Sequence, residues 1–343
     1  MPVKQIVMDG RTVNVDANRY AAFDGLRGQI QQAFAADAGF STRDAGETLA
    51  FMVSQLAYTE SEAFAKLYTP MQFRELVPVE SAGGWADTIR YELVDYAGQG
   101  KRINGAGHDL PMADIQFGEK TFPIVTGGVA YGYTYEEMQK SAFFRTPLPT
   151  GKLAAAMIAT ERHLNNVALF GESSSGLTGL YNNANVPQGS APVGTWSGAT
   201  ADNILKDINT CIQNVWNNTA FNDTPTDILI APAAMSIIVS TPRSANSDTT
   251  ILEYIKKNNI AKAERGIDIN FRSGYGLNTA GSGGTKRMMA YVKNPNRVKM
   301  HIPVELQFLA PQFVNLYTKV PGTYRYSGVE FRYPKSAYYM DGL

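Results

Sequence analysis

The chain has 343 residues, a length that suits two domains or one large body with a lobe. Hydrophobic residues make up 44% and charged residues 18%, which provides enough apolar material for a core and excludes a disordered chain. The 31 basic residues balance the 31 acidic ones, which disfavours a protein that grips nucleic acid through its whole surface.

Cysteine and histidine are both scarce in the sequence. The single cysteine excludes an internal disulfide and a multi-cysteine zinc site. His108, His163 and His301 lie too far apart for the short spacing of a metal-binding helix. The first residues carry no apolar stretch of the signal-peptide kind, and no apolar run approaches the ~20 residues of a membrane span. We therefore expect a soluble protein, by default cytoplasmic, with no bound metal.

Residues 1–70 are predicted to form an arm that contains helices. Apolar residues recur near the helical period in 27–35 and 49–67. Thr59 and Glu62 have the spacing of a capping box, which favours a new helix at that point. The alanine, glycine and aspartate residues between these pieces argue against one continuous rod.

Residues 72–130 change to the two-residue period of β-strands. One extended run covers 88–93, a glycine-rich reversal follows, and a second extended run returns through 115–124. This pattern predicts a long two-stranded hairpin with a mobile tip. Because a lone hairpin is marginally stable in water, we expect another copy of the chain to support it. The predicted inter-subunit contacts are Ile89, Tyr91, Leu93, Gly98, Gly100, Lys101, Gly105, Gly107, Ile115 and Phe117.

Residues 134–170 are predicted to be helical with one break. Thr134 and Glu137 have capping-box spacing, and Pro147 and Pro149 stop this first helix. A second helix is expected from about 151 to 170, with Gly171 at the C′ position. Its predicted apolar stripe is Leu153, Met157, Leu164, Val167 and Ala168. Residues 172–200 are rich in Ser, Gly, Asn and Pro, which indicates a loop.

Residues 201–295 are predicted to form an α/β lobe. Asp202 is the expected cap of a helix whose buried face is Ile204, Ile208, Cys211, Ile212 and Val215. The short apolar run 227–231 indicates a buried strand. Further helices are expected at 233–239 and 250–257, and further strands at 267–271 and 287–292.

Residues 296–343 show three alternating extended runs. The runs follow residues 299–308, 314–320 and 329–333, separated by Pro311 and by the turn at Ser327–Gly328. Together they predict an antiparallel meander with one buried face.

No catalytic or cofactor motif stands out in the sequence. The stretch 171–176 fails as a nucleophile elbow, because Ser175 stands where the glycine after Ser173 should be. The run GSGGTK at 281–286 has the wrong order for a phosphate loop. Cys211 lies on an apolar helix face, which favours a core residue, and His163 is better interpreted as a surface or interface residue. We therefore predict no enzyme activity and no cofactor.

Two runs of sequence and the order of the elements resemble one known family. The first run is ATERHLNNVALFG at 159–171, which continues into GLTGLYN at 176–182. The second is GVEFRYP at 328–334, followed by Tyr338, Tyr339, Asp341 and Gly342. With these runs, and with an arm, a hairpin, a helix, an α/β lobe and a meander in this order, the chain resembles the major capsid proteins of tailed bacteriophages with the Hong Kong 97-type fold.

The resemblance implies an α+β fold with five parts. These are an N-terminal arm at 1–70, an extended β-hairpin loop with flanking strands at 71–130, a spine helix with its following loop at 131–200, an axial α/β lobe at 201–295, and a C-terminal β meander of the peripheral lobe at 296–343. Some family members join subunits through a lysine in the extended loop. Lys101 and Lys120 lie in that segment, and free surface lysines are the favoured interpretation.

The resemblance also implies the function of a major capsid protein. Copies would assemble through pentamers and hexamers into the icosahedral head of a virion, in the host bacterial cytoplasm, around DNA held only by weak nonspecific contact. Scaffolding, portal or decoration proteins are the other expected partners, and no membrane is expected. Two alternatives remain open at this point: an encapsulin-like compartment shell, and an enzyme with an unidentified carboxylate site. A tail tube subunit is disfavoured by the long helix and the α/β lobe.

Overall fold

The computed structural model describes residues 3–8, 11–16, 70–102, 112–144, 151–244 and 246–343. The chain divides into two compact units, 1–69 and 70–343. In the first unit, β1 (Val3–Met8) pairs with β2 (Arg11–Asp16) in an antiparallel hairpin. Only helices were expected in this arm, so the hairpin is a correction, and the helices predicted at 27–35 and 49–67 lie outside the described residues.

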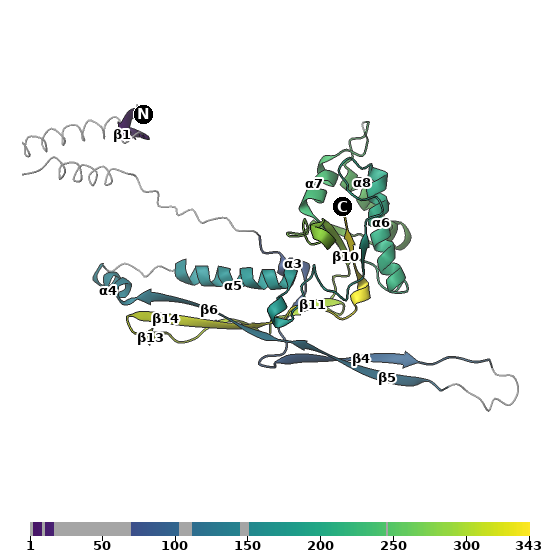
Figure 1. The fold of residues 1–343 in the computed structure, drawn as a ribbon, viewed down its shortest axis with the longest axis horizontal. Helices are drawn as coiled ribbons and strands as arrows, with labels where there is room; N and C mark the ends of the chain where they lie inside the picture. The colour runs from purple at the N-terminus through teal and green to yellow at the C-terminus, as the bar shows by residue number, and fades with distance from the viewer. Residues whose placement is uncertain (1–2, 9–10, 17–69, 103–111, 145–150, 245) are drawn as a thin grey trace, which may run out of the picture. The chain divides into compact units, whose positions relative to one another are not determined.

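The second unit contains the predicted two-stranded ribbon. β4 (Thr88–Ala97) and β5 (Asp114–Pro123) pair antiparallel along their full length and form a sheet of their own. Figure 1 shows the two strands side by side, and none of the other described strands pairs with either edge. The hairpin prediction is therefore confirmed, while the tip with Gly105 and Gly107 lies outside the described residues.

The helical prediction after the ribbon is also confirmed. α4 (Tyr135–Phe144) begins at the expected capping box, in which Thr134 and Glu137 each accept a hydrogen bond from the other's backbone N–H. α5 (Gly151–Phe170) has the predicted bounds. Gly171 ends it at φ +72° and donates its N–H to Val167. The predicted stops at 147 and 149 lie outside the described residues.

One member of the predicted stripe of α5 is placed differently. Leu164, Val167 and Ala168 are buried, but Met157 is 52% exposed. The first half of the helix is apolar on several sides, so periodicity alone did not identify which side is covered.

A four-stranded sheet lies against α5. Its central strand is β14 (Tyr317–Tyr326), which pairs along one edge with β6 (Val125–Thr134) and along the other with β12 (Val304–Phe308) and β13 (Gln312–Val314). His163 of α5 contacts the rings of Tyr324 and Tyr326 on β14. α5 therefore covers the face of the sheet that carries these two tyrosines.

A five-stranded sheet forms the α/β lobe. Its order is β7 (Gln188–Ser190), β16 (Ala337–Asp341), β10 (Arg287–Tyr291), β8 (Asp227–Ile230) and β9 (Asn270–Ser273). The accompanying helices are α6 (Ala201–Asn218), α7 (Pro232–Ser240), α8 (Ile251–Asn258) and α9 (Ile260–Arg265). Short 3-10 turns occur at Ser173–Ser175, Ser282–Gly284 and Pro334–Ser336.

The elements predicted for this lobe are largely confirmed. All five residues of the α6 stripe are fully buried, including Cys211. The helix cap is a correction, because Thr200 accepts the N–H of Asn203, whereas Asp202 accepts the hydroxyl of Tyr254. β9 begins at Asn270, later than the predicted start at 267, and α9 was not predicted.

The C-terminal residues do not form the single meander that was expected. β11 (Val298–His301) and β15 (Val329–Phe331) form a three-stranded sheet with β3 (Val79–Glu80), which follows the short helix α3 (Phe73–Leu76). β12, β13 and β14 belong to the sheet under α5, and β16 belongs to the lobe. The alternation through 299–308 breaks at Pro303, which has no N–H for a ladder.

The hydrophobic core runs from the lobe into the region of α3 and α5. Its largest fully buried side chains include Trp196, Trp216, Tyr181 and Tyr291. Asn165 of α5 anchors α3, because its Oδ1 accepts the N–H groups of Gln72 and Phe73. In the part of the chain that the structure describes, no helix combines the length and apolar character of a membrane span.

Candidate assembly surface

The register of the ribbon divides its side chains between two faces. Directly opposite residues share a face and neighbours along a strand alternate. Ile89 lies opposite Phe122, whereas Val94 lies opposite Phe117 and Tyr96 lies opposite Ile115. The predicted contacts therefore fall on opposite faces: Ile89, Tyr91 and Leu93 on one, and Ile115 and Phe117 on the other.

The face towards the ribbon tip carries an exposed apolar patch. It consists of two cross-strand pairs, and the exposed fractions are 44% for Val94, 73% for Phe117, 79% for Tyr96 and 48% for Ile115. We call these four residues the ribbon patch. A cluster of large apolar side chains that stays exposed among the described residues marks an interaction surface.

The face near the ribbon base packs partly on its own chain. The Arg332 guanidinium lies 5.0 Å from the centre of the Tyr91 ring. Burial raises the pKa of the Tyr91 hydroxyl, and the nearby Glu330 carboxylate adds to that effect. Ile89, Tyr91 and Leu93 are half-buried, so this part of the predicted contact already has an intramolecular neighbour.

The remaining predicted contacts lie at the start of the tip. Gly98, Gly100 and Lys101 are exposed. At Gly98 an added Cβ would lie 3.0 Å from the Cβ of Ala113, so the two strands approach closely there. The small residue permits that approach.

Three cation contacts join the body to the segment from β3 to the start of the ribbon. Glu80 of β3 pairs with Lys299, Asp87 beside β4 pairs with the buried Arg325 at 2.9 Å, and Tyr91 of β4 lies under Arg332. Each cation belongs to the C-terminal strands β11 and β14 or follows β15. Together with the pairing of β3 with β11, these contacts attach the ribbon base to the body, while the ribbon patch stays exposed.

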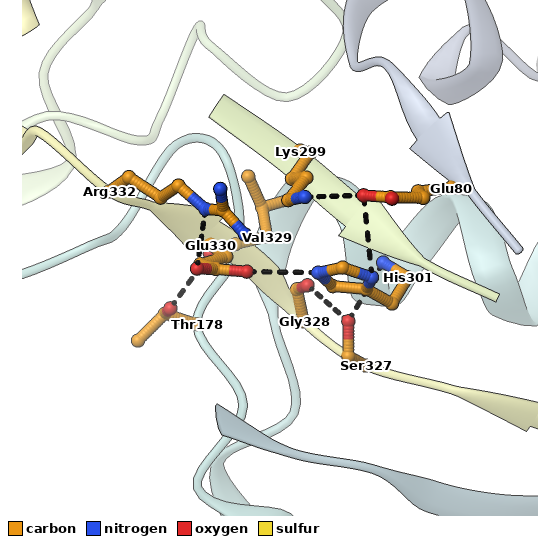
Figure 2. Close-up of polar contacts among 9 residues, drawn as sticks. All are labelled: Glu80, Thr178, Lys299, His301, Ser327, Gly328, Val329, Glu330 and Arg332. Carbon is orange, nitrogen blue, oxygen red and sulfur yellow. Dashed lines mark hydrogen bonds and ion pairs between the residues drawn. The ribbon is translucent and has the colours of Figure 1, made fainter. Parts of the chain in front are cut away.

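Figure 2 shows a buried polar cluster beside these attachments. His301 Nε2 lies 3.0 Å from Glu330 Oε2, and Arg332 Nε lies 3.2 Å from Glu330 Oε1. An ionised carboxylate only accepts hydrogen bonds, so His301 carries its proton on Nε2. Ser327 binds the backbone N–H of His301, which ties the turn before β15 to β11.

The cluster shifts the ionisation of both carboxylates. Burial raises the pKa of Glu330, but the hydrogen bond from His301 and the charge of Arg332 outweigh it, so the net pKa is below the usual 4.5. The hydrogen bond from Lys299 lowers the pKa of Glu80. Sequence reasoning missed this cluster, although Lys299 and His301 stand two apart on β11 and so share a face. Glu330 and Arg332 show the same spacing, with Arg332 directly after β15.

The residues that were considered for chemistry show no catalytic arrangement. Burial raises the pKa of the Cys211 thiol to about 12, so it stays protonated. His163 is held in ring contacts with Tyr324 and Tyr326. Within the described residues, no group of three or more His, Cys, Asp or Glu side chains could hold a metal ion.

One comparison identifies a family, and another identifies similar folds. A protein-family model described as "Major capsid protein" matches residues 98–343. The fold is similar to the solved capsid of Myoviridae phage XM1, at 16% identity and a TM-score of 0.72 over 84% of this chain and 98% of that one. It is also similar to a chain from Microbacterium phage Oxtober96, at 12% identity and a TM-score of 0.56 over 85% of this chain and 98% of that one.

A third similar structure is from Gordonia phage Cozz, at 13% identity and a TM-score of 0.55 over 89% of this chain and 96% of that one. At such identities the structural likeness establishes the fold, and it confirms the expected mixed α+β architecture. No curated protein sequence matches the chain.

Proposed function

The chain belongs to the major capsid protein family, and from this premise we propose that its copies form pentamers and hexamers that close into an icosahedral phage head around DNA. Proteins of this family are structural and associate with copies of themselves into shells, which places the chain in a virion. A closed shell needs many modest contacts that add up through symmetry.

The ribbon is the single observation that carries the proposal. A two-stranded ribbon is marginally stable in water, and this one leaves Val94, Tyr96, Ile115 and Phe117 exposed beyond its attached base. A neighbouring copy that covers the ribbon patch would order the ribbon and join two subunits together. Specific interfaces of this kind bury on the order of 1,000 Å² or more.

We assign the parts of the chain to roles in the shell on the same basis. Residues 1–70 are the N-terminal arm, 71–130 the extended loop, 131–200 the spine helix and its loop, 201–295 the axial lobe, and 296–343 the remainder of the peripheral lobe. The strand β16 joins the sheet of the α/β lobe, so the two lobes share the C-terminal segment.

The other proposed partners follow from the net charge of the chain and from the steps that assembly of a shell requires. A net charge of zero gives packaged DNA only weak nonspecific contact with the wall. Scaffolding, portal and decoration proteins are the remaining proposed partners. Assembly takes place in the cytoplasm of the host bacterium.

The test is a double substitution in the ribbon patch, Tyr96→Thr with Phe117→Thr. Threonine keeps a high strand propensity and removes both exposed rings. The matched control is Asp95→Thr with Gln116→Thr, which changes the neighbouring cross-strand pair on the opposite face. Sedimentation and negative-stain electron microscopy of the purified proteins measure shell formation, and circular dichroism measures folding.

We expect the patch variant to stay folded and to form few or no shells, while the control assembles like the unmodified chain. Deleting residues 98–107 at the tip should likewise give a folded subunit that assembles poorly. Normal shells from both the patch variant and the deletion would refute the role of the ribbon.

A further inference from the structure

The strand β6 leaves one long edge unpaired. All ten of its residues pair with β14 on one side, and no strand in the described part of the chain pairs with its other side. Unpaired N–H and C=O groups along an edge are a template for another strand.

Most of this edge lacks the features that usually protect a sheet edge. Proteins protect edges with charged residues, prolines, bulges or short strands. The sequence of β6, VTGGVAYGYT, contains no charge and no proline. Its pairing with β14 runs without a shift in register, in contrast to the pairing of β12 with β14. Side chains of the same chain occupy backbone groups at the C-terminal end of β6, where Lys152 binds the carbonyl of Gly132 and Glu137 accepts the N–H of Thr134.

A hollow of about 310 Å³ opens beside the middle of this edge. The wall on the helix side is formed by Ala159, Thr160 and His163 of α5, and the sheet side is formed by Gly127, Gly128, Val129, Tyr324 and Tyr326. A cavity of about 150 Å³ accepts a benzene ring, so the hollow has room for an aromatic side chain. Strand addition next to a side-chain pocket is a known mode of recognition.

The helix above the edge is also uncovered and free of charge. Residues 153–160 of α5 contain no charged side chain. Met157 is 52% exposed and Ile158 is 40% exposed, and Ala154, Ala155 and Ala159 are exposed as well. Lys152 binds the carbonyl of Gly132 at 3.1 Å while Ala159 lines the hollow at Gly127, so α5 follows β6 along its length. Between the Lys152–Glu137 ion pair and Thr160, helix and edge form one uncharged surface.

We propose that the outer edge of β6 pairs antiparallel with the same edge of a second copy about a two-fold axis, which joins two sheets into one continuous sheet. The inference rests on the proposed shell function, because it names one of the contacts between copies. An identical partner suits this edge because two uncharged strands meet without like-charge repulsion.

The register of such a pair is narrowly limited. Opposite residues must lie on the same face, so a two-fold axis that keeps nearly the whole edge paired passes at Val129 or at Ala130. An axis at Val129 places Tyr131 of the second copy opposite Gly127, and an axis at Ala130 places Tyr133 of the second copy there. In both registers an aromatic ring of one copy lies opposite Gly127, the glycine beside the hollow of the other copy. Because of the two-fold axis, the same contact forms twice.

The experiment uses cysteine substitutions in purified assembled shells. Val129→Cys and Ala130→Cys each place a thiol opposite its own copy in one of the two registers, where Cβ atoms lie about 5 Å apart. Thr126→Cys is the matched control, because it is exposed on the same strand and lies roughly 20 Å or more from its own copy in either register. The natural Cys211 is fully buried and should not react.

Mild oxidation is followed by non-reducing electrophoresis and by mass spectrometry of the linked peptides. We expect one of Val129→Cys and Ala130→Cys to give about tenfold more disulfide-linked dimer than Thr126→Cys, since a disulfide needs Cβ atoms about 4 Å apart. Shells that form normally without this dimer would overturn the β6 pairing and leave the shell function standing. Failure of the unmodified chain to form shells would instead count against the proposed function.

Discussion

The ion pair between Arg287 and Asp341 gives the sharpest test of what holds the α/β lobe together. Arg287 on β10 is 5% exposed and Asp341 on β16 is 7% exposed. Two parallel hydrogen bonds of 2.7 and 2.8 Å join the guanidinium to the carboxylate. The same guanidinium also donates to the carbonyl of Tyr181 and lies 4.5 Å from the centre of the Tyr339 ring.

Replacing one member leaves a buried charge without its partner. The substitution Asp341→Leu removes both carboxylate bonds and the acceptor of the Ser282 N–H at 2.9 Å. Breaking a buried pair in this way costs about 3–5 kcal/mol. Replacing both members by apolar residues, Arg287→Met with Asp341→Leu, removes the unpaired charge as well, so the double variant should recover most of the loss.

Urea unfolding of unassembled subunits, followed by circular dichroism, measures these free energies. The control is Glu161→Gln, which breaks a partly exposed pair with Arg74 and should cost about 1 kcal/mol or less. A loss for Asp341→Leu no larger than that of the control, or a double variant as unstable as the single one, would refute the role of the buried ion pair.

Three further predictions concern single residues. Asn165→Leu leaves two backbone N–H groups at α3 without their acceptor, which should lower the free energy of unfolding by about 1–3 kcal/mol for each lost bond. Urea unfolding measures this change, and an unchanged midpoint would contradict the prediction. The pKa of Glu330 is lowered in the folded state, because the hydrogen bond from His301 and neighbouring charge outweigh burial. The stability that the ionised Glu330 contributes is therefore fully present above about pH 4.5 and is lost as pH falls through the folded pKa. Between pH 6 and roughly pH 3.5, the melting temperature of Glu330→Gln should therefore fall less than that of the unmodified chain. An equal fall in the two proteins would refute this. The Cys211 thiol, whose pKa burial raises to about 12, should resist iodoacetamide at about pH 8 in the folded subunit and react on unfolding; mass spectrometry of the native protein decides this.

Elements with strong local signals were predicted well. α5 carries its C-terminal glycine, α4 its capping box and α6 a complete buried stripe, and all three are confirmed. These signals lie within a few residues of one another, so the surrounding fold does not need to be known.

Features that depend on distant partners were not predictable in the same way. The alternation in 299–308 indicates strands correctly, but its two halves belong to different sheets. The assignment of β11 depends on β3, which is more than 200 residues away in sequence. The hairpin of β1 and β2 had a local signal that was overlooked, namely Asp9-Gly10 between two alternating runs.

The candidate surface was predicted only in outline. The ribbon and its apolar residues followed from periodicity, but the faces follow from register, which the loop between the strands determines. Ile89 and Phe117 are both apolar, and only the pairing shows that they point in opposite directions. His301 and Glu330 lie on two different strands and are 29 residues apart in sequence, so no local pattern could predict their contact.

The position of β16 makes the α/β lobe depend on a segment far from the rest of its sheet in sequence. This strand lies between β7 and β10 inside the sheet, and Leu343 is buried. Removing β16 would split the sheet and leave β7 without a strand to pair with. We therefore expect a chain cut before Ala337 to lack a folded lobe.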